Sequence, residues 1–237
     1  MEIKLFKKPK NPIIVQGFPG FGLVGTISTE FLIEHLKTEY IGYIWLEELP
    51  TMVAIHNSKL VQPIGIFYDK KHNIVIFHVI TAAQGIEWKI TDAILDVAKQ
   101  LNATEIVCLE GVGSATLEEN QEPKTYFYAS SSAVGKKLAG NGIDALGEGI
   151  IMGATSALLL RSHIPTTALF AETHSNMPDS KAAAKIIKAL DVYLGLKVDY
   201  EPLLEAAVKF EEKLKTFMTK SQEASDMQEK KKLSYVG

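Results

Sequence analysis

Short apolar runs alternate with longer amphipathic runs from the N-terminus to about residue 195. Several short runs are rich in β-branched or aromatic side chains, which favours β-strands. Seven strands are predicted, at Ile13–Gln16, Tyr40–Leu46, Val53–His56, Ile64–Tyr68, Ile74–Val79, Glu105–Leu109 and Thr167–Ala171. The longer runs repeat apolar residues at helical spacing and predict helices at Leu23–Lys37, Ile86–Leu101, Ser130–Leu138, Ala154–Arg161 and Ser180–Leu194. This alternation is typical of an α/β domain built around a mixed, largely parallel sheet.

Local signals mark the turns between these runs. Asp69–Asn73 separates two strand runs and predicts a hairpin, which adds an antiparallel element to the sheet. Asn102 and Gly195 follow helical runs and are typical C-terminal stops, because both residue types tolerate a left-handed backbone. The stretch from Gly111 to Gly153 is rich in Gly, Glu and Ser, and we expect it to form loops above the sheet.

The pattern changes after Gly195, where a C-terminal segment begins. Pro202 suits the first turn of a helix. Apolar residues then recur at spacings of 4, 3, 4 and 3, at Leu203, Ala207, Phe210, Leu214 and Phe217. This apolar face favours a helix packed on its own domain, and an intersubunit coiled coil is the alternative.

The last residues are polar before they turn apolar again. Thr219 to Lys232 contains Met227 as its one large apolar side chain, so this stretch predicts a flexible tail. Its tip consists of Leu233, Ser234, Tyr235, Val236 and Gly237. We therefore expect an α/β domain over residues 1–200, an amphipathic helix over 201–218 and a flexible tail with an apolar tip over 219–237.

Composition narrows the class of protein. With 46% hydrophobic and 22% charged residues in a chain of 237, a sizeable core can form. The formal net charge of -3 disfavours nucleic acid and anionic membranes as partners. Cys108 is the single cysteine, so no internal disulfide can form and a reduced compartment is expected. No apolar stretch is long enough to span a membrane and Met1 to Lys10 is charged, so we expect a cytoplasmic protein.

A glycine-rich loop follows the first predicted strand. Gly20, Gly22 and Gly25 satisfy G-x-G-x-x-G, and Glu47 stands where an acid could hold a ribose hydroxyl, as in dinucleotide-binding proteins. However, Phe18 and Phe21 would crowd a pyrophosphate, and Pro19 in the same loop lacks an amide donor. The alternative is a tight strand-to-helix turn in which the glycines serve packing. A nucleotide- or nucleoside-binding enzyme that uses the Gly17 to Gly25 loop is thus one functional hypothesis.

Other candidate catalytic groups lie at predicted strand ends and loops. They are Glu110, Ser114, Glu148, Glu172, His174 and Ser175. No serine stands in a G-x-S-x-G elbow, and the histidines are too scattered for a metal-binding pattern. His56 and His78, at predicted strand ends, fit hydrogen-bonded structural roles. These observations favour a protein without catalytic residues, metal or cofactor.

Several spaced motifs resemble one family. Gly17 to Gly25 reads GFPGFGLVG, and Glu47 to Pro50 reads EELP. Thr81 to Gly85, Leu109 to Gly113 (LEGVG) and Gly149 to Gly153 (GIIMG) are further matches. With these motifs, the chain resembles the proteasome assembly chaperone family from about Pro12 to Leu194, in the archaeal branch similar to the second eukaryotic assembly chaperone.

The resemblance implies a three-layer α/β/α domain related in fold to nucleoside phosphorylases. It also implies a homo-oligomer, with related chaperone subunits as further partners, that binds proteasome core-particle α subunits without catalysis, as an assembly chaperone or an activator. In such proteins a C-terminal tip with a penultimate tyrosine inserts between α subunits. Here Tyr235 is third from the end and follows Ser234. The proteasome-binding residues expected from the resemblance are Leu233, Tyr235, Val236 and Gly237.

Overall fold

The computed structural model describes residues 1–49, 53–56, 59–81, 85–113, 122–173, 177–202 and 204–205. Most strands belong to one sheet, and two form a separate hairpin sheet. The strands are β1 (Glu2–Leu5), β2 (Ile13–Gly17), β3 (Glu39–Trp45), β4 (Ala54–His56), β5 (Lys59–Val61), β6 (Ile64–Asp69), β7 (Ile74–Val79), β8 (Glu105–Gly113), β9 (Thr125–Ala129), β10 (Asp144–Ala145) and β11 (Thr166–Thr173).

Five α-helices are assigned among the described residues, and a 3-10 turn, η1 (Phe21–Leu23), precedes the first of them. Two helices end where the sequence predicts, because Asn102 (φ 53°) and Gly195 (φ 69°) adopt the left-handed backbone. The helices are α1 (Val24–His35), α2 (Glu87–Leu101), α3 (Ser132–Gly140), α4 (Gly153–Arg161) and α5 (Ser180–Leu194).

The main sheet is mixed, with its parallel strands in the middle. Its order is β1-β3-β6-β7-β2-β8-β11-β9-β10. The pairs β7·β2, β2·β8 and β8·β11 are parallel, whereas β1, β3 and β6 extend one side as an antiparallel meander. The predicted turn at Asp69–Asn73 is confirmed, since β6 and β7 pair as a hairpin and the Asp69 carboxylate accepts the His72 backbone N–H at 2.9 Å.

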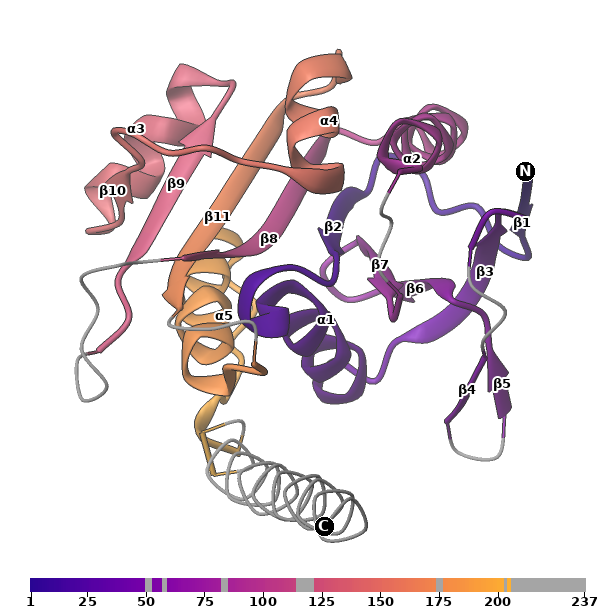
Figure 1. The fold of residues 1–237 in the computed structure, drawn as a ribbon, viewed down its shortest axis with the longest axis horizontal. Coiled ribbons are helices and arrows are strands. Elements are labelled where there is room, and N and C mark those ends of the chain that lie inside the picture. Colours follow the sequence, from indigo (N-terminus) through magenta and orange to yellow (C-terminus); the bar gives the residue numbers. More distant parts are fainter. Residues whose placement is uncertain are drawn as a thin grey trace, which may run out of the picture.

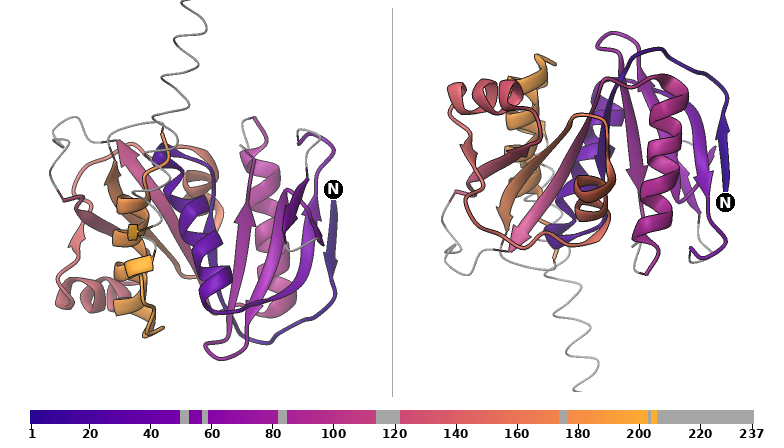
Figure 2. Two further views of the ribbon diagram at one scale, coloured as in Figure 1. Left: turned by 90° about the horizontal axis from the view of Figure 1, so that it is seen from below. Right: turned by 90° about the horizontal axis from the view of Figure 1, so that it is seen from above.

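Helices cover both faces of the sheet, which gives three layers. Helices α1 and α5 lie side by side on one face, and α2 and α4 cover the other (Figures 1 and 2). Strand alternation directs consecutive residues into different cores: Val107 packs with the α1–α5 layer, whereas Cys108 packs with the α2–α4 layer. The predicted α/β fold is thus confirmed.

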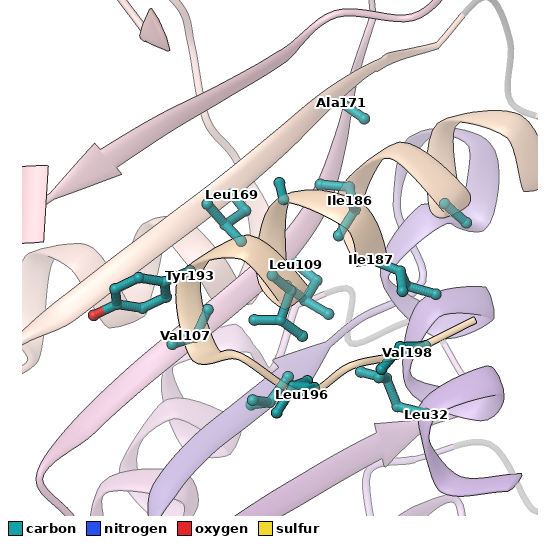
Figure 3. Close-up of a cluster of buried hydrophobic side chains, with 14 of the residues drawn as sticks. Leu32, Val107, Leu109, Leu169, Ala171, Ile186, Ile187, Tyr193, Leu196 and Val198 are labelled. Atoms are coloured by element: carbon teal, nitrogen blue, oxygen red, sulfur yellow. The ribbon is translucent and has the colours of Figure 1, made fainter. Parts of the chain in front are cut away.

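Figure 3 shows the packing of α5 on the central strands. Ile186 and Ile187 of the helix belong to the same buried cluster as Val107 of β8 and Leu169 of β11. All four are fully buried. The chain then returns beneath α5, and Val198 packs near Leu32 of α1, so the segment after α5 belongs to this core.

Apart from the helix predicted at Ser130–Leu138, which is confirmed as α3, the prediction that Gly111 to Gly153 forms loops above the sheet is wrong. This stretch contains the last part of β8, then β9, α3 and β10, and β9 and β10 form one edge of the main sheet. Phe127 of β9 and Leu138 of α3 are buried in the α1–α5 core. The sheet extends here because β9 pairs antiparallel with β11.

Little of the predicted C-terminal helix falls within the described part. Residues 201–202 and 204–205 are helical, with Pro202 in the first turn as expected. The remainder of the predicted helix, the predicted tail and the tip residues Leu233, Tyr235, Val236 and Gly237 lie outside the described residues.

A buried polar cluster lies at the amino end of β8. The Glu105 carboxylate is 8% exposed and accepts hydrogen bonds from the Tyr193 hydroxyl at 2.7 Å and the Thr167 hydroxyl at 2.6 Å. Burial and the Glu105 carboxylate raise the pKa of the Tyr193 hydroxyl. This cluster links β8, β11 and α5, because hydroxyl groups of β11 and α5 donate hydrogen bonds to the Glu105 carboxylate of β8.

Tyr193→Phe should therefore destabilise the fold by about 1–3 kcal/mol, because the buried carboxylate loses one of its donors. Urea denaturation gives the free energy of unfolding. Tyr128→Phe is the matched control, since Tyr128 is 49% exposed on β9, and it should change stability by less than about 0.5 kcal/mol. Equal effects of the two variants would contradict the role of the cluster.

Candidate functional site

The carboxyl ends of the central parallel strands meet at one edge of the sheet. Strands β2, β8 and β11 end there at Gly17, Gly113 and Thr173. Open α/β sheets bind ligands at this edge, because the loops that leave it diverge to different layers. Two features gather there: the glycine-rich loop and a pocket.

The glycine-rich loop is packed against its own helix and the neighbouring strand. A Cβ atom on Gly17 would overlap the carbonyl oxygen of Gly25, and one on Gly25 would overlap that of Leu109 in β8. Gly22 has a φ of 62°, and a Cβ atom there would lie 2.7 Å from the Thr173 hydroxyl. Gly17 and Gly25 are therefore required by close approach of backbone to backbone, and Gly22 by its left-handed backbone.

Carbonyl groups of the loop also accept hydrogen bonds from backbone N–H groups at the start of α1. The Leu23 N–H donates to the Gly20 carbonyl at 3.0 Å, and the Val24 N–H donates to the Phe21 carbonyl. Phe18 is 8% exposed and Phe21 is 39% exposed, so one ring is packed and the other reaches the surface. This is the tight strand-to-helix turn that the sequence offered as the alternative, and it leaves these amides unavailable to a pyrophosphate.

Glu47 does not lie where a dinucleotide site needs its ribose-binding acid. It follows β3, which is separated from β2 by β6 and β7 and pairs antiparallel with β6. In the dinucleotide fold the acid follows the strand that lies next to the first and parallel to it. The structure contradicts this part of the nucleotide hypothesis, because after α1 the chain crosses to β3, which lies next to the edge strand β1.

A pocket of about 600 Å³ opens beside the loop, over the ends of β8 and β11. Its wall comes from Phe21, from the end of β8, from β9 and from the segment that leads into α4. It is lined by Phe21, Glu110, Gly111, Val112, Gly113, Tyr126, Leu146, Gly147, Glu148, Gly149, Ile150, Ile151, Met152 and Glu172. Three of the predicted candidates, Glu110, Glu148 and Glu172, are thus brought together, whereas Ser114, His174 and Ser175 lie outside the described residues.

Sheet register explains why these side chains converge. Glu110 is paired with Phe170, and Phe170 with Tyr126, so the three form a row across β8, β11 and β9. Glu172 lies two residues beyond Phe170 on the same face. Its carboxylate accepts the Tyr126 hydroxyl at 3.1 Å and the Lys124 backbone N–H at 3.2 Å.

Glu110 has the most perturbed carboxyl group of the pocket. Burial raises its pKa to about 7, against a smaller opposing effect of a hydrogen bond from the Thr155 hydroxyl of α4. The Gln16 amide donates to the same Thr155 oxygen at 3.3 Å, while the Gln16 Oε1 atom is buried without a partner among the described residues. Gln16 and Thr155 were not predicted to lie near a site. The one indication of them in the sequence was a polar residue at the end of each apolar run.

A second hollow of about 560 Å³ lies along α1, on the opposite layer. Leu23, Ile27 and Phe31 line it together with His78 and Pro202. The His78 ring is 4% exposed, with Nδ1 2.9 Å from the Thr29 hydroxyl and Nε2 2.7 Å from the Glu30 carboxylate. The predicted hydrogen-bonded structural role is confirmed for His78.

The described residues form neither a metal-binding cluster nor a membrane-spanning helix. No group of three or more His, Cys, Asp or Glu side chains there is arranged to hold a metal ion. Within the same part of the chain, no helix has the length and apolar character required to cross a membrane.

The chain belongs to the PAC2 family, whose model matches residues 14–218. Among curated proteins it is similar to the uncharacterized protein MJ0106 of Methanocaldococcus jannaschii, with 26% identity over 87% of this chain and 85% of that protein. The family assignment agrees with the resemblance found in the sequence motifs.

Solved structures share the fold over the whole chain. PbaA of Pyrococcus furiosus, described as an archaeal homolog of proteasome-assembly chaperone, is 29% identical, covers 98% of both chains and gives a TM-score of 0.81. A second crystal structure of PbaA is 30% identical over 94% of this chain and 99% of that one, with a TM-score of 0.80. PbaB of the same organism, described as an archaeal proteasome activator, has the same fold at 24% identity, with a TM-score of 0.76 over 92% of this chain and 98% of that one.

Gly25→Ala should destabilise the protein by about 3 kcal/mol or more, because the added methyl group meets the backbone of β8 and not a mobile side chain. Thermal and urea denaturation measure this loss. Gly140→Ala is the control: a Cβ atom at the end of α3 has no neighbour within 4 Å, so the change should be neutral or slightly stabilising. A well-folded Gly25→Ala variant of wild-type stability would contradict the packing role of the glycine.

Glu110→Gln should make stability less dependent on pH. Since the pKa of Glu110 is raised to about 7 in the folded state, the folded protein binds an extra proton between the ordinary carboxyl range and pH 7. Stability of the wild type should therefore fall relative to Glu110→Gln as pH rises from 5 to 8. Melting temperatures across this range test it, with Glu2→Gln on β1 as the control for a lost surface charge. A difference between the two proteins that is constant with pH would exclude a raised pKa.

Proposed function

We propose that this protein is a non-catalytic proteasome-binding protein, an assembly chaperone or activator that recognises proteasome α subunits. The observation that carries this proposal is the match to PbaA over 98% of both chains. A match of this extent includes the loops and the end segments, where binding surfaces lie, as well as the sheet. Family membership over residues 14–218 supports the same class of function.

The surface of the domain is consistent with binding a macromolecule. Ile150 is 90% exposed and Met152 is 61% exposed, both on the segment before α4. On the hairpin of β4 and β5, the cross-strand pair Ile55 and Leu60 is 70% and 52% exposed. Grouped exposed apolar side chains are typical of surfaces that bind other proteins.

The described residues offer weak support for catalysis. The glycine-rich loop is filled by its own backbone, and burial raises the pKa of the Cys108 thiol to about 12, so that thiol stays protonated and unreactive. We therefore retain the binding function and give the nucleotide- or nucleoside-binding enzyme second place.

The tip is proposed as one of two contact regions. Leu233, Tyr235, Val236 and Gly237 form an apolar end on a polar segment, which would allow the tip to reach a partner while the domain contacts it elsewhere. In a homo-oligomer, several tips would act together and increase the effective concentration of each. We place this assembly in the cytoplasm.

A variant that ends at Lys232 should bind core proteasome or isolated α-subunit rings at least about tenfold more weakly than the full chain, because multivalent tip contacts are lost. Native mass spectrometry of each protein with these partners measures the complex and the oligomer together. The melting temperature should not change, because the polar stretch Thr219 to Lys232 separates the tip from the rest of the sequence.

A variant with residues 233–237 replaced by glycine and serine is the matched control for tail length. It should bind as weakly as the truncated protein. Equal binding by all three proteins would move the contact to the domain surface, and absence of binding by the full chain would refute the proposed function.

A further inference from the structure

The pocket at the ends of β8 and β11 contains a desolvated carboxyl group, Glu110, that no cation among the described residues faces. Within the described part of the chain, its wall includes three glutamates and no lysine, arginine or histidine. By contrast, exposed carboxylates elsewhere are paired, as in Lys89–Glu48, Arg161–Asp92 and Lys185–Glu122. A desolvated carboxyl without a counter-charge destabilises its own ionised form, and such groups concentrate at functional sites.

The polar groups beneath the pocket are short of donors. The Thr155 hydroxyl has one proton, which it donates to Glu110 while its oxygen accepts from Gln16. The Gln16 Oε1 atom is fully buried without a partner among the described residues. In the same region, the Glu172 carboxylate takes its donors from Tyr126 and the Lys124 backbone. Of these groups, the Glu110 and Glu172 carboxylates line the pocket, so a ligand that brings N–H donors and positive charge to them would complement it.

The shape of the pocket indicates what carries such a group. A volume of about 600 Å³ lies within the range of ligand pockets, about 300–1,000 Å³. Rings of Phe21 and Tyr126 line it, and aromatic rings attract guanidinium and ammonium groups. At the rim, Ile150 and Met152 are among the most exposed apolar side chains of the described residues. A free small cation would leave this rim uncovered, whereas a polypeptide would cover it.

We propose that this pocket binds a lysine or arginine side chain of a partner protein, in an ion pair with Glu110, while apolar residues that flank the basic residue cover Ile150 and Met152. The occupant is thus a protein segment of basic and apolar character. This inference concerns a site other than the C-terminal tip and does not depend on the identity of the partner.

Binding should strengthen with pH. The titratable groups around Glu110 are Glu148 on the segment before α4, Glu172 on β11, Tyr126 on β9 and the buried thiol of Cys108 on β8, and none of them is cationic. Helix α4 contributes its N-terminal turn through Thr155. With a pKa of about 7, the ionised fraction of Glu110 rises about tenfold between pH 6 and pH 8, and affinity for a cation should follow.

The test uses the full chain and a pair of isosteric peptides. The probe is acetyl-Ala-Leu-Arg-Leu-Ala-amide, and its twin carries citrulline, which keeps the shape of arginine without the charge. Isothermal titration calorimetry should show the arginine peptide binding at least tenfold more tightly than the citrulline peptide at pH 8, and the advantage should shrink at pH 6. Glu110→Gln should abolish the difference, whereas Glu2→Gln, at the opposite edge of the sheet, should preserve it.

Two further experiments show whether the cation belongs to a protein segment or to a free small molecule. Agmatine, a free guanidinium compound, should bind at least tenfold more weakly than the arginine peptide. Ile150→Ser should weaken the peptide and leave agmatine unchanged, and because Ile150 is 90% exposed this variant should fold normally. Agmatine binding as tight as the peptide, with no effect of Ile150→Ser, would overturn a protein occupant in favour of a small one. Equal binding of the arginine and citrulline peptides would refute the cation site itself, whatever the protein does with proteasomes.

Discussion

The close backbone approach of Gly17 to Gly25, and of Gly25 to the carbonyl of Leu109, fixes the centre of the molecule. It brings the end of β2, the start of α1 and the middle of β8 within a distance that no side chain would permit. Helix α1 can then cover the β2–β8 pair, and the 3-10 turn between strand and helix directs Phe21 outward. The Gly22 carbonyl accepts the Asp179 N–H at 2.8 Å, so the same turn also positions the start of α5. The two helices of one layer thus depend on one glycine-rich turn.

The buried carboxyl groups at the two ends of β8 differ in the number of hydrogen-bond donors around them. At the amino end, Glu105 is surrounded by the hydroxyls of Tyr193 and Thr167, so its charge is compensated and the cluster holds three elements together. At the carboxyl end, Glu110 is desolvated with one hydroxyl donor, and its pKa rises to about 7. Stability alone would favour a carboxylate surrounded by hydroxyl donors, as at Glu105, at both ends of β8. An uncompensated carboxyl at the edge where α/β folds bind ligands is therefore better explained by recognition than by folding.

Binding surfaces and scaffold are separable in this fold. The α/β/α layers supply a rigid frame, whereas two groups of exposed apolar side chains lie outside it, on the segment before α4 and on the β4–β5 hairpin. A fold of this class supports many functions, so function must be argued from such surfaces and from the family. The PAC2 assignment and the likeness to PbaA give the class, and the acidic pocket gives a specific contact that this class does not by itself imply.

The sequence alone determined most of the local elements, although it did not predict strands β1, β5, β9 and β10. All five helices were predicted within two residues at each end, and the stops at Asn102 and Gly195 were correct, because helical periodicity and left-handed caps are properties of short stretches. The glycine-rich motif predicted a tight turn but could not exclude a bound nucleotide. Whether a nucleotide can bind depends on whether backbone or ligand fills the space around the glycines. Tertiary structure decided this, and it placed β9 and β10 in the sheet although their segment is rich in Gly, Glu and Ser. It also decided the pocket: Gln16 and Thr155 are 139 residues apart, and only sheet pairing and helix packing bring them beneath Glu110.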